Sequence, residues 1–186
     1  MQRTLLAACG CAALACVAAS DDAQAPATTD PKVAEFLDAI GLDKVDVVKS
    51  MLSGGGAASL ANAGNEYNET PLHISAIKAN LEVIDLLLAA GANPNAHTDG
   101  NYPGHKLPVQ RTPLMWLVYP CYTDAMKKVV AAGADPNFIN EEGKTVLDIA
   151  IGQGEPCVQV RADLLSAGAK TAAELGHTAL PADGEL

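Results

Sequence analysis

The sequence predicts an all-α solenoid of stacked repeats, and two observations indicate this fold class. First, the segment at residues 70–95 recurs in altered form at residues 112–137 and again from Thr145 onward; each copy opens with Thr, Pro or Val, and Leu, and closes on Gly-Ala. Second, the spacing is regular, because 21 residues separate the opening Thr from the closing Gly in the first two of these copies and 23 in the last. A unit repeated at a fixed period is typical of a solenoid, in which neighbouring copies bury a shared core.

Each copy is expected to contain two helices and a finger-like loop. Thr70 can cap the inner helix, and Pro71 favours its first turn because proline fixes a helical φ and lacks an N–H that would go unbonded there. Leu72 and the small residues Ser75 and Ala76 follow in the inner helix, and an apolar run at 83–88 indicates the buried face of an outer helix. Gly91 then ends that helix in a left-handed turn, after which the chain runs out as the finger.

This arrangement resembles the ankyrin repeat over about residues 32–170, and the match is specific in the three later copies. A divergent first copy precedes them, with helices expected near 32–40 and 44–52 and a glycine stop after the second. Its finger would carry Asn68 where the family usually has glycine, since asparagine accepts a left-handed backbone. The resemblance implies about four repeats with a long finger between the second and third, and it implies that His73 hydrogen-bonds between units.

The N-terminus indicates a secretory signal peptide at residues 1–19. Arg3 precedes an apolar run that is too short to span a bilayer, and residues 17–19 supply the small side chains that a signal peptidase reads. A lipoprotein signal with a lipid anchor at Cys16 is the alternative. A disordered linker at 20–30, the ankyrin repeat domain at 31–170 and a C-terminal tail at 171–186 follow. We therefore expect a periplasmic or secreted protein with no membrane insertion after cleavage.

Cys121 and Cys157 are the two cysteines left after cleavage, and we expect them to form a disulfide. Disulfides persist in exported proteins. Both cysteines fall in the loop that joins the inner and outer helices, in adjacent units. The two extra residues of the last copy can extend its loop and bring the Cα atoms within the limit of about 7 Å for a bridge. The pair is not Cys-x-x-Cys, which does not favour a redox-catalytic thiol.

The finger between the second and third copies is nine residues too long, because 21 residues separate Gly91 from Thr112 whereas 12 separate Gly133 from Thr145. Insertions in repeat arrays lie in loops and often on the binding face. A neutral surface insertion is the alternative, since long loops cost little free energy.

No motif in the chain indicates an enzyme. The sequence lacks a nucleophile elbow, a phosphate-binding glycine loop and a dinucleotide fingerprint. His97, Asp99 and His105 are the plausible metal-ligand cluster, but their spacing fits no compact zinc motif. We expect neither a metal nor another cofactor, and a thiol- or metal-dependent enzyme is the alternative from a different class.

The formal charge is −10, and it is −11 without residues 1–19, which contain Arg3 and no acidic residue. This charge excludes nucleic acid and an anionic membrane as favoured ligands. It can attract a basic protein partner. Four acidic residues are expected at finger tips, where such a partner would meet them: Glu66, Glu69, Glu141 and Glu142.

The resemblance places the binding surface on the concave face made by the fingers and the exposed side of the inner helices. The expected helix contacts are Ile77, Lys78, Tyr119 and Tyr122, and tyrosines are common at the centre of interfaces. The expected finger contacts are Tyr67, Glu69, Ile139, Glu141, Glu142 and Lys144, with Tyr102, His105 and Lys106 in the long finger. Trp116 is expected in the core. The predicted function is that of a monomeric, protein-binding module in the bacterial periplasm, acting either as a scaffold or as an immunity or inhibitor protein against a secreted toxin.

Overall fold

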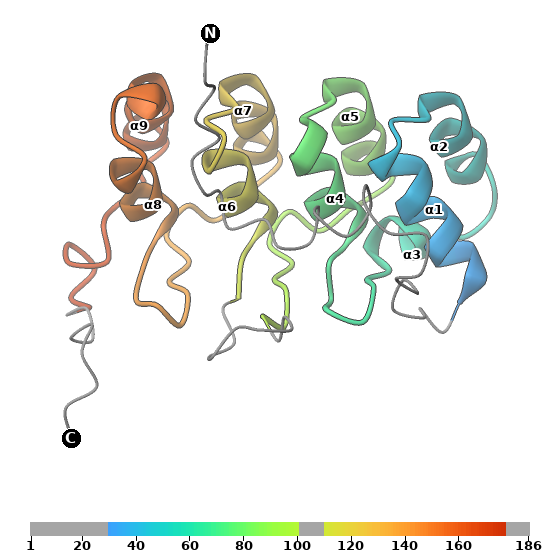
Figure 1. Cartoon of the computed structure of the whole chain (residues 1–186), viewed down its shortest axis with the longest axis horizontal. Helices are drawn as coiled ribbons and strands as arrows, with labels where there is room; N and C mark the ends of the chain where they lie inside the picture. The colour runs from blue at the N-terminus through green and yellow to red at the C-terminus, as the bar shows by residue number, and fades with distance from the viewer. Residues whose placement is uncertain (1–29, 101–109, 178–186) are drawn as a thin grey trace, which may run out of the picture.

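The computed structural model describes residues 30–100 and 110–177, and in these residues four helix pairs stack side by side (Figure 1). The inner helices are α1 (Pro31–Gly41), α4 (Pro71–Lys78), α6 (Pro113–Val118) and α8 (Val146–Gly152). The outer helices are α2 (Val45–Leu52), α5 (Leu81–Ala89), α7 (Thr123–Ala131) and α9 (Val158–Ser166). Two short elements, α3 (Ala57–Asn62) and η1 (Glu155–Cys157), complete the order. The predicted all-α repeat solenoid is confirmed.

Several sequence predictions concern residues outside the described ranges. They are the signal peptide at 1–19, nearly all of the linker at 20–30, the last part of the tail, and three contacts of the long finger, namely Tyr102, His105 and Lys106.

The predicted helix starts are confirmed in the three later units. Thr112 Oγ1 accepts a hydrogen bond from Met115 N at 3.3 Å, and Thr145 Oγ1 accepts one from Asp148 N at 3.3 Å. Thr70 forms a capping box with the histidine three residues later. Each contact satisfies an N–H of the first helical turn that has no partner within the helix.

Left-handed residues shape the connections between the helices. Gly91 ends α5 with a φ of 86°, and Asn68 turns the first finger with a φ of 57°, as the sequence predicts. The turn from inner to outer helix also needs a left-handed residue, which is Ala79 after α4 and Cys121 after α6, with φ values of 50° and 61°. A residue with a Cβ is uncommon in this region, so the stack holds these two turns in place.

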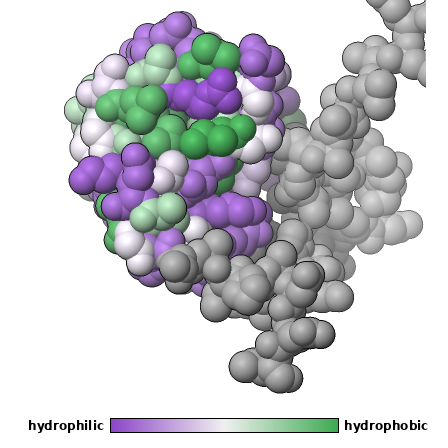
Figure 2. All heavy atoms as spheres, turned by 90° about the vertical axis from the view of Figure 1, so that its left-hand side faces the viewer, coloured by the Kyte–Doolittle hydropathy of each residue, from purple (hydrophilic) through white to green (hydrophobic). Residues whose placement is uncertain are grey.

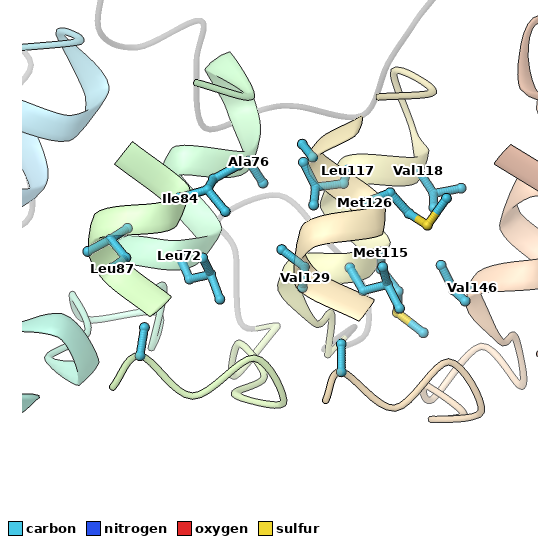
Figure 3. Close-up of a cluster of buried hydrophobic side chains, with 14 of the residues drawn as sticks. Leu72, Ala76, Ile84, Leu87, Met115, Leu117, Val118, Met126, Val129 and Val146 are labelled. Atoms are coloured by element: carbon cyan, nitrogen blue, oxygen red, sulfur yellow. The ribbon is translucent and has the colours of Figure 1, made fainter. Parts of the chain in front are cut away.

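The core is continuous along the stack. Figure 3 shows side chains of α4 and α5 filling the space toward α6 and α7, among them Leu72 and Ile84 on one side and Val129 on the other. All three are at most 1% exposed. Each fully buried side chain of this size stabilises the fold by about 1.5–3 kcal/mol. A single unit therefore has little core of its own and depends on its neighbours.

A ladder of three asparagines ties each unit to the next at the base of the fingers: Asn62, Asn95 and Asn137. Each side-chain amide donates to the carbonyl of the glycine that ends the next outer helix, with N···O distances of 2.8, 2.9 and 3.2 Å. Each side-chain oxygen accepts from the backbone N–H two residues beyond that glycine, at 2.7, 2.6 and 2.8 Å. One side chain thus satisfies a donor and an acceptor of the neighbouring unit.

The first unit differs from the expectation by the additional helix α3. Gly56 precedes Thr70 by 14 residues, whereas Gly133 precedes Thr145 by 12. The two added residues let the chain form a turn of helix before the finger, and Asn62 at its end still occupies the ladder. The glycine stop after α2 was predicted, but this helix was not.

The last unit leaves apolar side chains uncovered at the end of the stack. Ile151, Val158 and Leu165 are 50%, 48% and 57% exposed. Ile151 stands where the preceding unit has Val118, which is fully buried. Figure 2 shows this end of the molecule, with apolar residues gathered in a patch among hydrophilic ones. Within the described residues no unit packs on this side of the fourth one, so positions that a neighbour covers in the other units are exposed here.

Candidate protein-binding face

The fingers project to one side of the stack, below the inner helices in Figure 1. Hydrogen bonds link them sideways. Asn68 Nδ2 donates to the carbonyl of His97 at 2.8 Å, and the N–H of Asp99 donates to the carbonyl of Tyr67 at 2.9 Å. The N–H of Gln110 donates to Glu141 Oε2 at 2.6 Å. Successive fingers are therefore fixed relative to one another, and with the inner helices they form the concave face.

His73 anchors this face between two units. Its Nε2 lies 2.9 Å from the carbonyl oxygen of Arg111, and its Nδ1 lies 3.1 Å from the backbone nitrogen of Thr70. Because a carbonyl can only accept, Nε2 carries the proton and Nδ1 accepts from Thr70. Burial lowers the pKa of His73 to about 4, so the ring is neutral at pH 7. The predicted role of His73 in hydrogen bonding between units is confirmed.

Arg111 and Trp116 contact this histidine, and Tyr119 lies against Arg111. The edge of the Trp116 ring meets the His73 ring, with centroids 5.6 Å apart and an interplanar angle of 70°. The Arg111 guanidinium carbon lies 5.5 Å from the centre of the Tyr119 ring. All three side chains are half-buried. We call Arg111, Trp116 and Tyr119 the central cluster.

Trp116 packs against the core, as expected, but it is half-buried and not enclosed. Its position in α6 matches that of Ile74 in α4, which is also half-buried. The helix thus turns one side of the indole toward the core and leaves another side on the concave face.

Most of the other predicted contacts keep some exposure. Lys78, Tyr122, Glu141, Glu142 and Lys144 are exposed, whereas Tyr67, Ile77 and Ile139 are half-buried. The acidic tips also have partners within the chain, since Glu141 receives the N–H of Gln110 and Glu142 lies 3.6 Å from the Lys144 amine. Tyr122 precedes α7, at the opposite end of α6 from its finger.

The prediction that Glu69 is a finger-tip contact is wrong. Glu69 is 4% exposed, and its carboxylate accepts a hydrogen bond from Asn65 Nδ2 at 2.7 Å. The finger closes on itself, because Asn65 Oδ1 accepts from the N–H groups of Tyr67 and Glu69 at 3.0 Å each. This closure draws Glu69 to the base of the finger, next to the cap of α4, where a partner does not reach its side chain.

The structure joins Cys121 and Cys157 in a disulfide, with Cα atoms 5.1 Å apart. Cys121 is the left-handed residue of the turn after α6, and Cys157 closes the short helix η1. The extra residues of the last unit form η1 and carry Cys157 toward the third unit. Neither sulfur is a free thiol in this state.

Of the two histidines in the candidate metal cluster, the structure describes His97, which contacts an aromatic ring. The ring of His97 stacks on Phe138, with centroids 5.8 Å apart and an interplanar angle of 12°. His105 lies outside the described residues. Within residues 30–100 and 110–177, no three His, Cys, Asp or Glu side chains gather as a metal site, and no helix there has the length and apolar character of a membrane span.

Sequence reasoning missed Arg111 as a site residue. It lies just before the helix cap Thr112, where the unit before has Glu69 and the unit after has Lys144, so its position in the repeat gives no signal. Its carbonyl lies 2.9 Å from His73 Nε2 of the unit before, and its guanidinium lies over the Tyr119 ring of its own unit; these tertiary contacts place Arg111 on the concave face.

Comparisons with known proteins agree with this architecture. The family model for the ankyrin repeat matches residues 67–99, which comprise the end of the first finger, α4, α5 and the start of the long finger. The chain is also 25% identical over 111 residues to the B-cell lymphoma 3 protein homolog of Mus musculus. That similarity covers 59% of this chain and 24% of the relative, so the chain spans about a quarter of the relative's length. Ankyrin repeats are protein–protein interaction modules. Residues 67–99 match this repeat, and the stacked helix pairs and linked fingers of the described residues have the same architecture.

Proposed function

We propose that this protein acts in the bacterial periplasm as a non-enzymatic module that holds a protein partner on its concave face. The observation that carries the proposal is the central cluster, in which Arg111, Trp116 and Tyr119 lie half-exposed on a face of linked fingers. Arginine, tryptophan and tyrosine are the residues that most often dominate the binding energy of protein interfaces.

The rigidity of the face supports the same function. The asparagine ladder fixes one unit on the next, and the links from Asn68 to His97 and from Gln110 to Glu141 fix the fingers. A surface that is ordered before binding loses less conformational entropy when a partner docks, and this loss is one of the main costs of association.

Export is the second part of the proposal. Residues 1–19 have the charge, apolar run and small residues of a signal peptide. The bridge between Cys121 and Cys157 is of a kind that persists in an oxidising compartment. The test is the mass of the protein isolated from bacterial envelopes. A chain that begins at Ser20 supports export as a free protein, lipid on Cys16 supports an anchored form, and an intact N-terminus in the cytoplasm refutes export.

Binding is tested by capture from envelope extracts with the purified, non-reduced protein and two matched variants. Tyr119→Ala removes an aromatic side chain from the central cluster, and Tyr122→Ala removes the same side chain from the turn before α7. A stoichiometric protein partner that Tyr119→Ala loses and Tyr122→Ala retains supports the concave face. Loss with Tyr122→Ala alone moves the interface to the helix turns and refutes it.

A third variant tests the long finger by replacing residues 101–109 with a short turn. Thr98 and Asp99 stay, because Thr98 bonds Arg111 and the N–H of Asp99 bonds Tyr67. Retention of the partner by this variant would mark the insertion as neutral. The activity of the captured partner then separates the two roles, since an inhibitor blocks that activity whereas a scaffold leaves it intact or raises it.

A further inference from the structure

We propose that the central cluster receives the side-chain carboxylate of an aspartate or glutamate on the partner, with Arg111 and Trp116 as the donors. This inference rests on the proposed function, because it names the chemistry that the same face recognises.

Arg111 has a fixed backbone and an uncommitted side chain. Its N–H donates to Thr98 Oγ1 at 3.2 Å, while its carbonyl accepts from Thr98 N at 3.1 Å and lies 2.9 Å from His73 Nε2. Its guanidinium forms no hydrogen bond or ion pair with any residue in the described ranges, and its Nε is buried there without a partner. The backbone thus holds the second finger on α4, and the charged group is not needed for that contact.

Trp116 provides a second donor at the same place. Its Nε1 is buried and has no hydrogen-bond partner among the described residues. An indole N–H can only donate, so it remains unsatisfied until an acceptor arrives. Trp116 touches the ring of His73 while Arg111 bonds the same ring through its carbonyl, so the two residues that carry the unpaired donors contact one histidine.

The missing group is an acceptor with negative charge. Burial without a partner costs a polar group free energy, which an incoming acceptor recovers. His73 is neutral, so Arg111 supplies the positive charge of the cluster. A carboxylate fits it best because the planar guanidinium pairs with a planar carboxylate through two parallel hydrogen bonds.

The surroundings favour a side chain on a protein segment over a free small anion. The ring of Tyr119 lies under the guanidinium, and Trp116 adds half-buried apolar surface to the same cluster. Such surface contacts the aliphatic part of a peptide, which a small anion lacks. The charge of −10 on the whole chain repels strongly acidic proteins, so we expect the carboxylate on a partner that is not acidic overall.

The test uses a displayed library of random 12-residue peptides with blocked C-termini, so that all carboxylates are side chains. The library is selected on the purified, non-reduced protein. Trp116 is the one tryptophan of the chain, so its fluorescence reports peptide binding at the cluster without a label. We expect selected peptides to share an Asp or Glu at one position.

A double-mutant cycle then isolates the pair. Changing that acidic residue to its amide is expected to weaken binding to the wild-type protein about 10- to 100-fold, as for other hydrogen-bonded charge pairs. The same change should matter less than about 2-fold for Arg111→Gln, which has already lost the cation. Arg161→Gln is the matched control, because Arg161 lies on α9 and donates to Gly154 O.

The outcomes separate this inference from the proposed function. Peptides that need Tyr119 but carry no shared acidic residue, or that tolerate the amide in the wild-type protein, overturn the carboxylate contact and leave the binding face standing. Peptides whose affinity is unchanged by both Tyr119→Ala and Arg111→Gln, or a library that yields no binder, overturn both. Circular dichroism of Arg111→Gln verifies that the fold is retained.

Discussion

Acidification to pH 5 should weaken the stack through His73. In the folded protein the ring is neutral, its Nε2 bonds the carbonyl of Arg111 and its Nδ1 accepts from Thr70. Protonation would put a proton on Nδ1, which then faces the N–H of Thr70 and can no longer accept from it. A charged ring would also lose its hydration in this buried site. The folded state therefore resists protonation, and the pKa of His73 is lowered from 6.5 to about 4.

The sign and size follow from proton linkage. Between pH 6.5 and about 4 the unfolded chain binds a proton at this histidine that the folded chain does not, so the free energy of unfolding falls as the pH falls. A difference of about 2.5 pKa units corresponds to about 3 kcal/mol once the pH reaches 4, with 1.36 kcal/mol per unit. From pH 7 to pH 5 the expected loss is about 2 kcal/mol, in a range where ordinary carboxylates stay ionised.

The assay is urea unfolding followed by circular dichroism at pH 7 and pH 5, for the wild-type protein and for His73→Met. Methionine is the matched replacement because Met115 occupies the equivalent position of the third unit. The variant is less stable at pH 7, since it lacks the hydrogen bond to Arg111, but it should lose less than about 0.5 kcal/mol on going to pH 5. Equal losses in the two proteins would refute the reasoning, because the proton would then bind elsewhere.

Three further perturbations test the scaffold, each by chemical denaturation. Asn95→Ala removes two hydrogen bonds between units and should cost about 1–2 kcal/mol with no change in helix content; an unchanged midpoint would contradict the ladder. Reduction of the bridge between Cys121 and Cys157, which are 36 residues apart, should cost about 3–4 kcal/mol, and two free thiols in envelope-derived protein would contradict the bridge itself. Ile84→Ala should cost about 2–5 kcal/mol because this side chain is fully buried, whereas the matched Leu165→Ala, at 57% exposure, should cost less than about 1 kcal/mol.

Most of the fold could be predicted from the repeat motifs, because each motif acts on the backbone of its own and neighbouring residues. Thr112 caps a helix by accepting from an N–H three residues later. Gly91 and Asn68 adopt the left-handed backbone that ends a helix and turns a finger, respectively. Such preferences depend on residues close together in the chain, so they can be recognised in the sequence. The period of the motif then implies stacking, and stacking implies a continuous core.

The tertiary structure decided which finger side chains are buried and which residues meet across unit boundaries. Glu69 looks like an exposed finger residue in the sequence, but Asn65 folds the finger over it. Arg111 reaches the concave face because His73, 38 residues earlier, bonds its carbonyl and because Tyr119 lies beneath its guanidinium. The bond between His73 and Arg111 joins two units, so no local preference encodes it. It depends on the offset between stacked units, which the packing of side chains in the core sets, and that offset determines which donors on the binding face are left for a partner.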